Sequence, residues 1–236
     1  MVNGNHDLHI HSEYSDANSG IFEIAERADT LGLQTIAVTD HFWPSLGSRK
    51  GGSGLIESRR REIVEARSHF PDLTILDGAE VDIAADGTLA EVAGGLDQFD
   101  IIIGSFHWSM DSSQWVQALT RALREPEFNI LGHWDGFLTY FREGDGLAAA
   151  KALANARVAV ELSGRYQVQY PRFLEQAREA GCEFSFGSDA HSVEGIGRLQ
   201  FQRRLASDLG LNIVKVEQLL SRRDYTRAAS NVEKIL

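Results

Sequence analysis

The sequence has few features that would cross-link the chain covalently or anchor it in a membrane. Its one cysteine, Cys182, cannot form a disulfide within the chain, so nothing requires an oxidising compartment. No apolar run approaches the roughly 20 residues that span a bilayer. Residues 1–6 lack the basic flank and apolar core of a signal peptide. We therefore expect a cytoplasmic protein without a membrane segment.

Positive charge is also scarce. The chain has 23 lysines and arginines against 34 aspartates and glutamates, which gives a net charge of −11. Tight binding to nucleic acid needs a basic surface and is not expected here. A small phosphate ester remains possible as a partner, because bound divalent cations would reverse the sign of the local field. The 236 residues, 43% of them hydrophobic, fit one α/β domain or at most two small ones; we expect a single domain over residues 1–236, with the oligomeric state left open.

Short apolar runs alternate with amphipathic segments along the chain, and each run has the length of a strand. The expected strands are Asp7–His11, Thr35–His41, Leu73–Val81, Asp100–His107, Asn129–Trp134, Val158–Ser163 and Glu183–His191. The expected helices are Phe22–Leu31, Ile56–Phe70, Gln114–Leu123, Leu147–Ala156 and Pro171–Ala180. Such alternation is typical of parallel strands covered by helices, and seven strands approach the eight of a TIM barrel.

We therefore predict an α/β fold, a distorted seven-stranded TIM-like barrel. The alternative is an open, doubly wound sheet, which would place a glycine-rich phosphate loop after the first strand. His9, Ile10, His11 and Ser12 occupy that place instead.

Histidines and carboxylates gather where the expected strands end. Six of the eight histidines do so, namely His9, His11, His41, His107, His133 and His191, and Glu80 and Asp189 share this placement. The carboxyl ends of parallel strands meet at one face of a barrel. Each residue alone could be a buried or capping side chain, but the whole set favours a metal site. Imidazole and carboxylate ligands suit zinc, manganese or iron, and the absence of clustered thiolates argues against a cysteine-rich structural zinc site.

Six segments carry a resemblance to a known family, and they follow one another in that family's order. They are Asp7–Asp16, Ala37–His41, Gly78–Glu80, Gly104–His107, Leu131–His133 and Gly187–His191. With these motifs the chain resembles the PHP (polymerase and histidinol phosphatase) family of metal-dependent phosphoesterases over nearly its whole length. The resemblance implies a distorted seven-stranded barrel, in agreement with the strand count.

The resemblance also implies nine metal ligands, and all nine positions hold a competent residue. The first metal would be bound by His9, His11, Glu80 and Asp189. Glu80 would bridge to a second metal, whose other ligands would be His107 and His133. A third metal would be bound by Asp16, His41 and His191. The chain departs from the family at Trp134–Asp135, where proline is frequent, and at Val160–Ser163. We expect both departures to touch the pocket wall.

Two or three adjacent cations suit phosphoryl chemistry, because they polarise phosphoryl oxygens and lower the pKa of a bound water. The expected nucleophile is a metal-bound hydroxide held by His9, His11, Glu80, His107 and Asp189. Phosphate also favours a guanidinium, and Arg165 and Arg198 follow the last two strands, although either could be a plain surface charge. Arg49 and Lys50 are weaker candidates.

The leading hypothesis is hydrolysis of a small phosphate monoester similar to histidinol phosphate. The alternatives are a phosphodiesterase or 3′–5′ exonuclease acting on nucleotides or short oligonucleotides, and a non-catalytic metal-binding scaffold. The segment Val214–Leu236 is expected to be helical and to close the barrel base or meet a partner.

Overall fold

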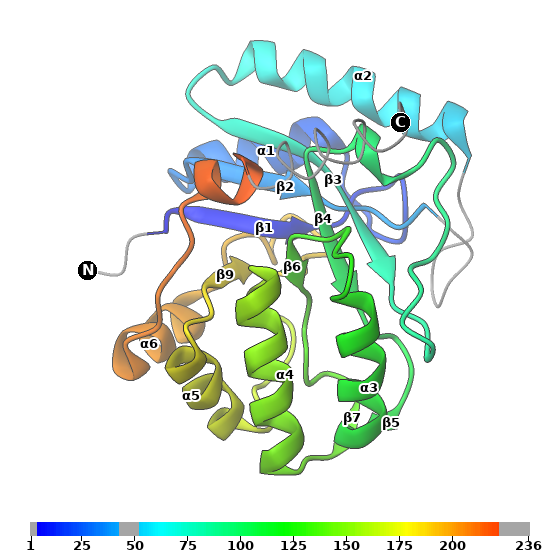
Figure 1. The fold of residues 1–236 in the computed structure, drawn as a ribbon. Helices are drawn as coiled ribbons and strands as arrows, with labels where there is room; N and C mark the ends of the chain where they lie inside the picture. Colours follow the sequence, from blue (N-terminus) through cyan, green and yellow to red (C-terminus); the bar gives the residue numbers. More distant parts are fainter. Residues whose placement is uncertain (1–3, 43–51, 222–236) are drawn as a thin grey trace.

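Seven parallel strands form a nearly closed barrel in the computed structural model, which describes residues 4–42 and 52–221 (Figure 1). The strands are β1 (His6–Ile10), β2 (Thr35–Val38), β3 (Thr74–Asp82), β4 (Ile101–Ser105), β6 (Ile130–Leu131), β8 (Ala159–Ser163) and β9 (Phe184–Gly187). They neighbour one another in sequence order, and every pairing is parallel.

The first and last strands meet and close the barrel. The backbone N–H of His11 donates to the carbonyl of Ala190 at 2.9 Å, and the N–H of Asp189 donates to the carbonyl of His9 at 2.8 Å. An open sheet would leave these two strands at opposite edges, so the doubly wound alternative is wrong. The predicted distorted seven-stranded barrel is confirmed.

All five expected helices are present. The helices are α1 (Ile21–Thr30), α2 (Ser53–His69), α3 (Ser112–Ala122), α4 (Glu143–Ala156), α5 (Pro171–Ala180) and α6 (Gln200–Leu209), with a 3₁₀ turn η1 (Leu96–Gln98). Figure 1 shows α1 and α2 on one side of the barrel and α3, α4 and α5 on the other. Helix α3 begins before its apolar pattern because Asp111 accepts the N–H groups of Ser113 and Gln114 at 2.9 and 3.0 Å.

Two features were not expected. Strands β5 (Met110–Asp111) and β7 (Leu138–Tyr140) pair in a small second sheet, and they are too short to show an alternating pattern. Helix α6 (Gln200–Leu209) was also not expected, although Leu205, Ala206 and Leu209 lie on one side of it and pack against the main hydrophobic core. Of the segment Val214–Leu236, which was expected to be helical, residues 216–221 are helical, Val214 and Lys215 are not, and residues 222–236 lie outside the described residues. Arg49 and Lys50 also lie outside them.

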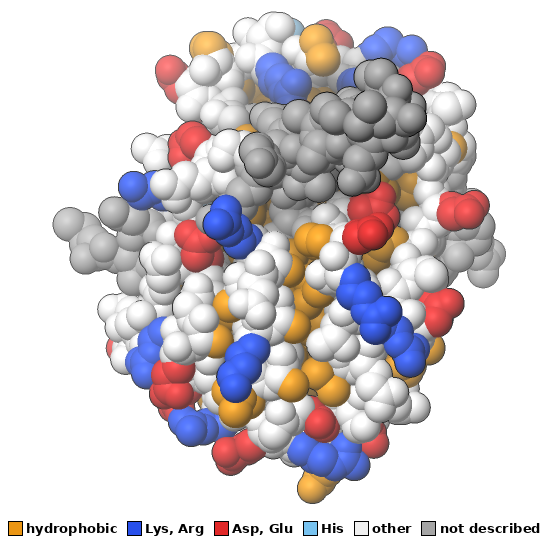
Figure 2. Space-filling model, in the orientation of Figure 1, with side chains coloured by type: hydrophobic (Ala, Val, Ile, Leu, Met, Phe, Trp, Pro, Cys, Tyr) orange, Lys and Arg blue, Asp and Glu red, His pale blue; other side chains and the backbone are white. Residues whose placement is uncertain are grey.

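Several strands end earlier than the apolar runs suggested. β2 stops at Val38, β4 at Ser105 and β9 at Gly187, and the polar residues that follow lie on the first turns of the connecting loops. Among the described residues, none of the helices combines the length and the hydrophobicity that a bilayer crossing demands. On the face shown in Figure 2, basic and acidic side chains are interspersed and form no continuous basic stripe.

Candidate metal centre

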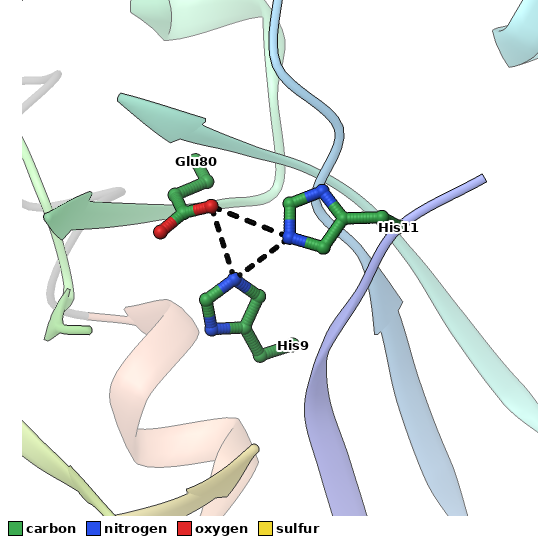
Figure 3. Close-up of side chains that lie close together, drawn as sticks. All are labelled: His9, His11 and Glu80. Atoms are coloured by element: carbon green, nitrogen blue, oxygen red, sulfur yellow. Dashed lines mark hydrogen bonds and ion pairs between the residues drawn. The ribbon is translucent and has the colours of Figure 1, made fainter. Parts of the chain in front are cut away.

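Four donor atoms converge at the carboxyl end of the barrel. Figure 3 shows His9 from β1, His11 just after it and Glu80 from β3 pointing toward one another. Nε2 of His9 lies 3.1 Å from Nε2 of His11 and 3.2 Å from Oε2 of Glu80, and His11 Nε2 lies 3.3 Å from the same oxygen. Oδ1 of Asp189 is 3.3 Å from His11 Nε2 and 3.9 Å from His9 Nε2.

These separations fit the ligands of one cation. Metal–ligand bonds of about 2.1 Å in a tetrahedron place neighbouring ligand atoms about 3.4 Å apart. Two imidazole nitrogens and two carboxylate oxygens are also a competent donor set for zinc, manganese or iron. The residues present therefore fit the metal that the sequence implied.

Glu80 lies at the centre of a larger group of imidazoles. Its second oxygen, Oε1, is 2.9 Å from Nε2 of His133 and 3.5 Å from Nε2 of His107. Its first oxygen, Oε2, is also 3.4 Å from Nε2 of His41. One carboxylate thus has different histidines near each oxygen, which is the arrangement a bridging ligand needs.

The outer end of the cluster is formed by Asp16 and His191. Oδ2 of Asp16 lies 3.2 Å from Nε2 of His191, and its Oδ1 lies 3.6 Å from Nδ1 of His11. His41 belongs to two groups of possible metal ligands. One group joins it to His11 and Asp16, and the other joins it to Glu80 and His107. The nine residues predicted as ligands therefore form one continuous cluster. Its more exposed members are Asp16 and His191, so solvent reaches the cluster at this end.

Opposite charges within the cluster shift one another's pKa values. Burial by itself would raise the pKa of Glu80, but the positive charges of His9, His107 and His41 outweigh it and keep that pKa well below its usual range. Burial would likewise lower the pKa of His11, yet its hydrogen bonds to Asp189 and Glu80 raise it to about 9. The carboxylates are thus kept ionised by positive partners. A divalent cation supplies the same positive charge while displacing the protons.

Of the two arginines predicted to bind phosphate, the structure brings one to the cluster. Arg165 follows β8, and its Nη1 lies 2.6 and 2.9 Å from the ring nitrogens of His191 and 3.4 Å from Oδ1 of Asp189. Its side chain is still 46% exposed and can reach a ligand above the cluster. Arg198 is exposed, and its charge acts on Glu194; no described contact joins its side chain to the cluster.

Two carboxylates behind the cluster were missed by the sequence interpretation. Oε1 of Glu161 lies 2.7 Å from Nδ1 of His9, and Oδ1 of Asp82 lies 2.7 Å from Nδ1 of His107. The expectation that residues 160–163 touch the pocket wall is wrong for Glu161, which contacts a predicted ligand. A carboxylate inside an apolar strand was the available signal. For Asp82 the signal was its period-two spacing from Glu80.

A buried ion pair supports the loop after β1. The carboxylate of Asp40 accepts the N–H and the hydroxyl of Ser12, both at 2.7 Å. The guanidinium of Arg59 donates to Asp40 at 2.9 Å and also pairs with Asp77. Arg59 and Asp40 are completely buried. Helix α2 thereby fixes the loop between two predicted ligands.

On the other side, Trp134, one of the departures from the family pattern, is not part of a pocket wall. It is buried and packs against Trp115 and Phe173 in the core. The wall beside the cluster is formed instead by Tyr166, whose ring centroid lies 5.0 Å from that of His133, and by Phe137.

Comparison with known proteins agrees with this geometry. The sequence profile of the PHP domain matches residues 7–166. The DNA polymerase/3'-5' exonuclease PolX of Bacillus subtilis (strain 168) is 31% identical over 196 residues, which cover 80% of this chain and 34% of the relative. The chain thus spans about a third of that relative's length. A probable phosphatase of Aliivibrio fischeri (strain MJ11) is 28% identical over 224 residues, covering 89% of this chain and 87% of the relative.

Solved structures share the fold. Histidinol phosphate phosphatase from Lactococcus lactis, crystallised with zinc, L-histidinol and phosphate, superimposes with a TM-score of 0.69 at 19% identity, covering 89% of this chain and 95% of that chain. A putative histidinol phosphatase from Listeria monocytogenes gives a TM-score of 0.65 at 15% identity, covering 84% and 99% of the two chains. With the family profile matching more than half of its residues, the chain belongs to the PHP domain family and is a metal-dependent phosphoesterase.

Proposed function

We propose that the chain hydrolyses the phosphate monoester of a small molecule similar to histidinol phosphate. The proposed centre binds two or three divalent cations, which are zinc, manganese or iron. Its proposed ligands are His9, His11, Asp16, His41, Glu80, His107, His133, Asp189 and His191. The observation that carries this proposal is the convergence on Glu80, where donor atoms of five histidines lie within 3.5 Å of the two carboxylate oxygens.

Each group of side chains has its own part in the proposed reaction. When bound, the cations would polarise the phosphoryl oxygens and lower the pKa of a water molecule. Arg165 would donate its N–H groups to the phosphoryl oxygens in a bidentate fork, since it already lies at the exposed end of the cluster. The rings of Tyr166 and Phe137 would exclude water beside His133 and limit the leaving group to a compact one.

Two comparisons support a small substrate. Relatives named as probable phosphatases match this chain over most of their own length, as the protein from A. fischeri does. The structural neighbour from L. lactis was crystallised with L-histidinol and phosphate, the two parts of such an ester. The net charge of −11 also disfavours a polyanionic polymer.

A second candidate is a phosphodiesterase or 3′–5′ exonuclease for nucleotides or short oligonucleotides. The match at 31% identity to a protein named as a polymerase and 3'-5' exonuclease favours it. The same cation cluster would serve either ester, because both reactions place negative charge on phosphoryl oxygens. A non-catalytic scaffold has least support, since it gives no reason for so many buried charges at one end of the barrel.

The test is a substrate panel assayed with and without metal. Protein treated with a chelator is supplied with manganese, zinc or ferrous iron and offered histidinol phosphate, a mononucleotide, a cyclic nucleotide and a short oligonucleotide. The proposal predicts metal-dependent release of inorganic phosphate from the monoesters. Cleavage of the diesters alone would favour the second candidate, and no hydrolysis with any metal would refute both. Comparing Arg165→Ala with Arg198→Ala decides which arginine binds phosphate.

A further inference from the structure

A buried carboxylate outside the nine proposed ligands lies directly behind one of them. Glu161 belongs to β8, whose five residues are all buried, and is only 2% exposed. Removing a carboxylate from water is costly unless hydrogen bonds or charges compensate for it. The contacts of Glu161 therefore need an explanation beyond the filling of space.

Both oxygens of Glu161 are engaged, and each contacts a different proposed ligand. Oε1 lies 2.7 Å from Nδ1 of His9, and Oε2 accepts the backbone N–H of His133 at 2.6 Å. A carboxylate facing Nδ1 favours the ring form with its proton on Nδ1. Nε2 of His9 is then available to a metal, and this is the atom that lies 3.2 Å from Oε2 of Glu80.

Packing removes the alternative orientations of this pair. Gly187 of β9 lies against it, and a Cβ atom at this position would be 2.6 Å from Cβ of His9 and would overlap Oε1 of Glu161. The Cβ of His9 and the carboxylate of Glu161 therefore occupy the space that a side chain at position 187 would need. Neither group can move toward β9 without displacing the backbone of Gly187.

We propose that Glu161 is a positioning residue that fixes the ring of His9 and the backbone of His133 and thereby sets the affinity of the centre for its cations. The inference rests on the proposed function, because it assumes that His9 and His133 bind metal. One carboxylate joins β1 to the loop after β6 and so connects ligands that are assigned to two different cations. Carboxylate partners of this kind typically change metal affinity by about 10–100-fold when removed.

The chain contains a natural comparison in Asp82, which makes a similar contact with His107 at 2.7 Å. The side chain of Asp82 is 28% exposed, whereas that of Glu161 is 1% exposed. Water can replace part of the Asp82 contact but not the Glu161 contact. Asp82→Asn is therefore expected to weaken metal binding less than Glu161→Gln.

The experiment measures the zinc dissociation constant by competition with a chelator, together with the thermal unfolding midpoint of the metal-free protein. Glu161→Gln keeps the side-chain shape but has a single acceptor oxygen for two donors. Glu161→Asp keeps the charge but shortens the reach by about 1.5 Å. Asp100→Asn removes an equal charge at the opposite end of the barrel, where Asp100 accepts the N–H of Asp77 at 2.9 Å.

We expect both Glu161 variants to bind zinc at least tenfold more weakly than the wild type, with Asp100→Asn within twofold. Wild-type affinity in Glu161→Asp would show that charge alone acts and would overturn the positioning role. Unchanged affinity in Glu161→Gln with a lowered unfolding midpoint would show a merely structural role and would also overturn it. If the wild type binds zinc but hydrolyses no ester, the proposed function fails while the role of Glu161 stands. If the wild type binds no metal, both fail.

Discussion

Replacing Arg59 by methionine tests how the centre is supported by the barrel. The methionine would fill most of the volume of the arginine but would leave Asp40 buried without its cation. The carbonyls of Val38 and Gly78, which accept from Arg59 at 3.2 and 2.6 Å, would lose their donor as well. Removing one partner of a completely buried pair costs about 3–5 kcal/mol. We expect the free energy of unfolding to fall by that amount.

The same loss of unfolding free energy can be expressed as a fall in the thermal unfolding midpoint. An unfolding entropy of about 2.1 cal/mol/K per residue gives roughly 0.5 kcal/mol/K for a chain of this length, so the midpoint should fall by about 6–10 °C. Circular dichroism in the presence of a chelator measures it without a contribution from bound metal. Arg60→Met is the matched control, because Arg60 is 34% exposed and its pair with Asp77 is screened by solvent. Equal shifts in the two variants, or a shift below about 2 °C in Arg59→Met, would refute the reasoning.

Three further predictions concern the site and its surroundings. Arg165→Ala should raise KM for a phosphate monoester about tenfold or more, because hydrogen bonds to charged groups contribute about 1.5–3 kcal/mol. Steady-state kinetics measure this change, and a loss of kcat with an unchanged KM would contradict it. Gly187→Ala should abolish tight zinc binding, since its methyl group has no room beside Glu161 and His9; retention of wild-type affinity in a chelator competition would count against the packing argument. Burial, and then the charge of Arg203, lowers the pKa of His6 from 6.5 to about 4, so the unfolded chain binds more protons in that interval. The stability provided by neutral His6 is complete above pH 6.5. It is lost as the pH falls toward 4, by about 1.4 kcal/mol per pH unit. Denaturant titrations of His6→Asn over this pH range should therefore show a shallower decline in the free energy of unfolding than the wild type.

Much of the fold was predictable because it depends on local patterns. Most of the parallel strands are short apolar runs, and the helices carry apolar residues on the side that packs against the core. The ends of the strands were less predictable, because the expected strands included polar residues that lie on the first turns of the connecting loops. Asp189 is an example: it lies two residues after β9 and adopts a positive φ of 52°, which no periodicity reveals.

The proposed metal ligands could be predicted from the sequence, but the residues that hold those ligands in place could not. The His9-x-His11 spacing predicts that both imidazoles point the same way at the end of β1, and the topology of a barrel brings them to Glu80. The role of Glu161 could not be read from its neighbours, because the contact with His9 joins residues 152 positions apart. Arg165 and Arg198 are alike in sequence, since both follow a strand end, and only the three-dimensional arrangement separates them.

The most direct test of the metal centre compares the metal content and the turnover of wild type with those of Asp189→Ala after reconstitution with manganese or zinc. We predict two or three equivalents of metal in the wild type and phosphate release that rises with occupancy. The variant should keep its fold by circular dichroism, bind at least one equivalent fewer and release no phosphate. Full metal content with unchanged turnover in Asp189→Ala, or hydrolysis by the wild type that persists after the metal is removed, would contradict the account.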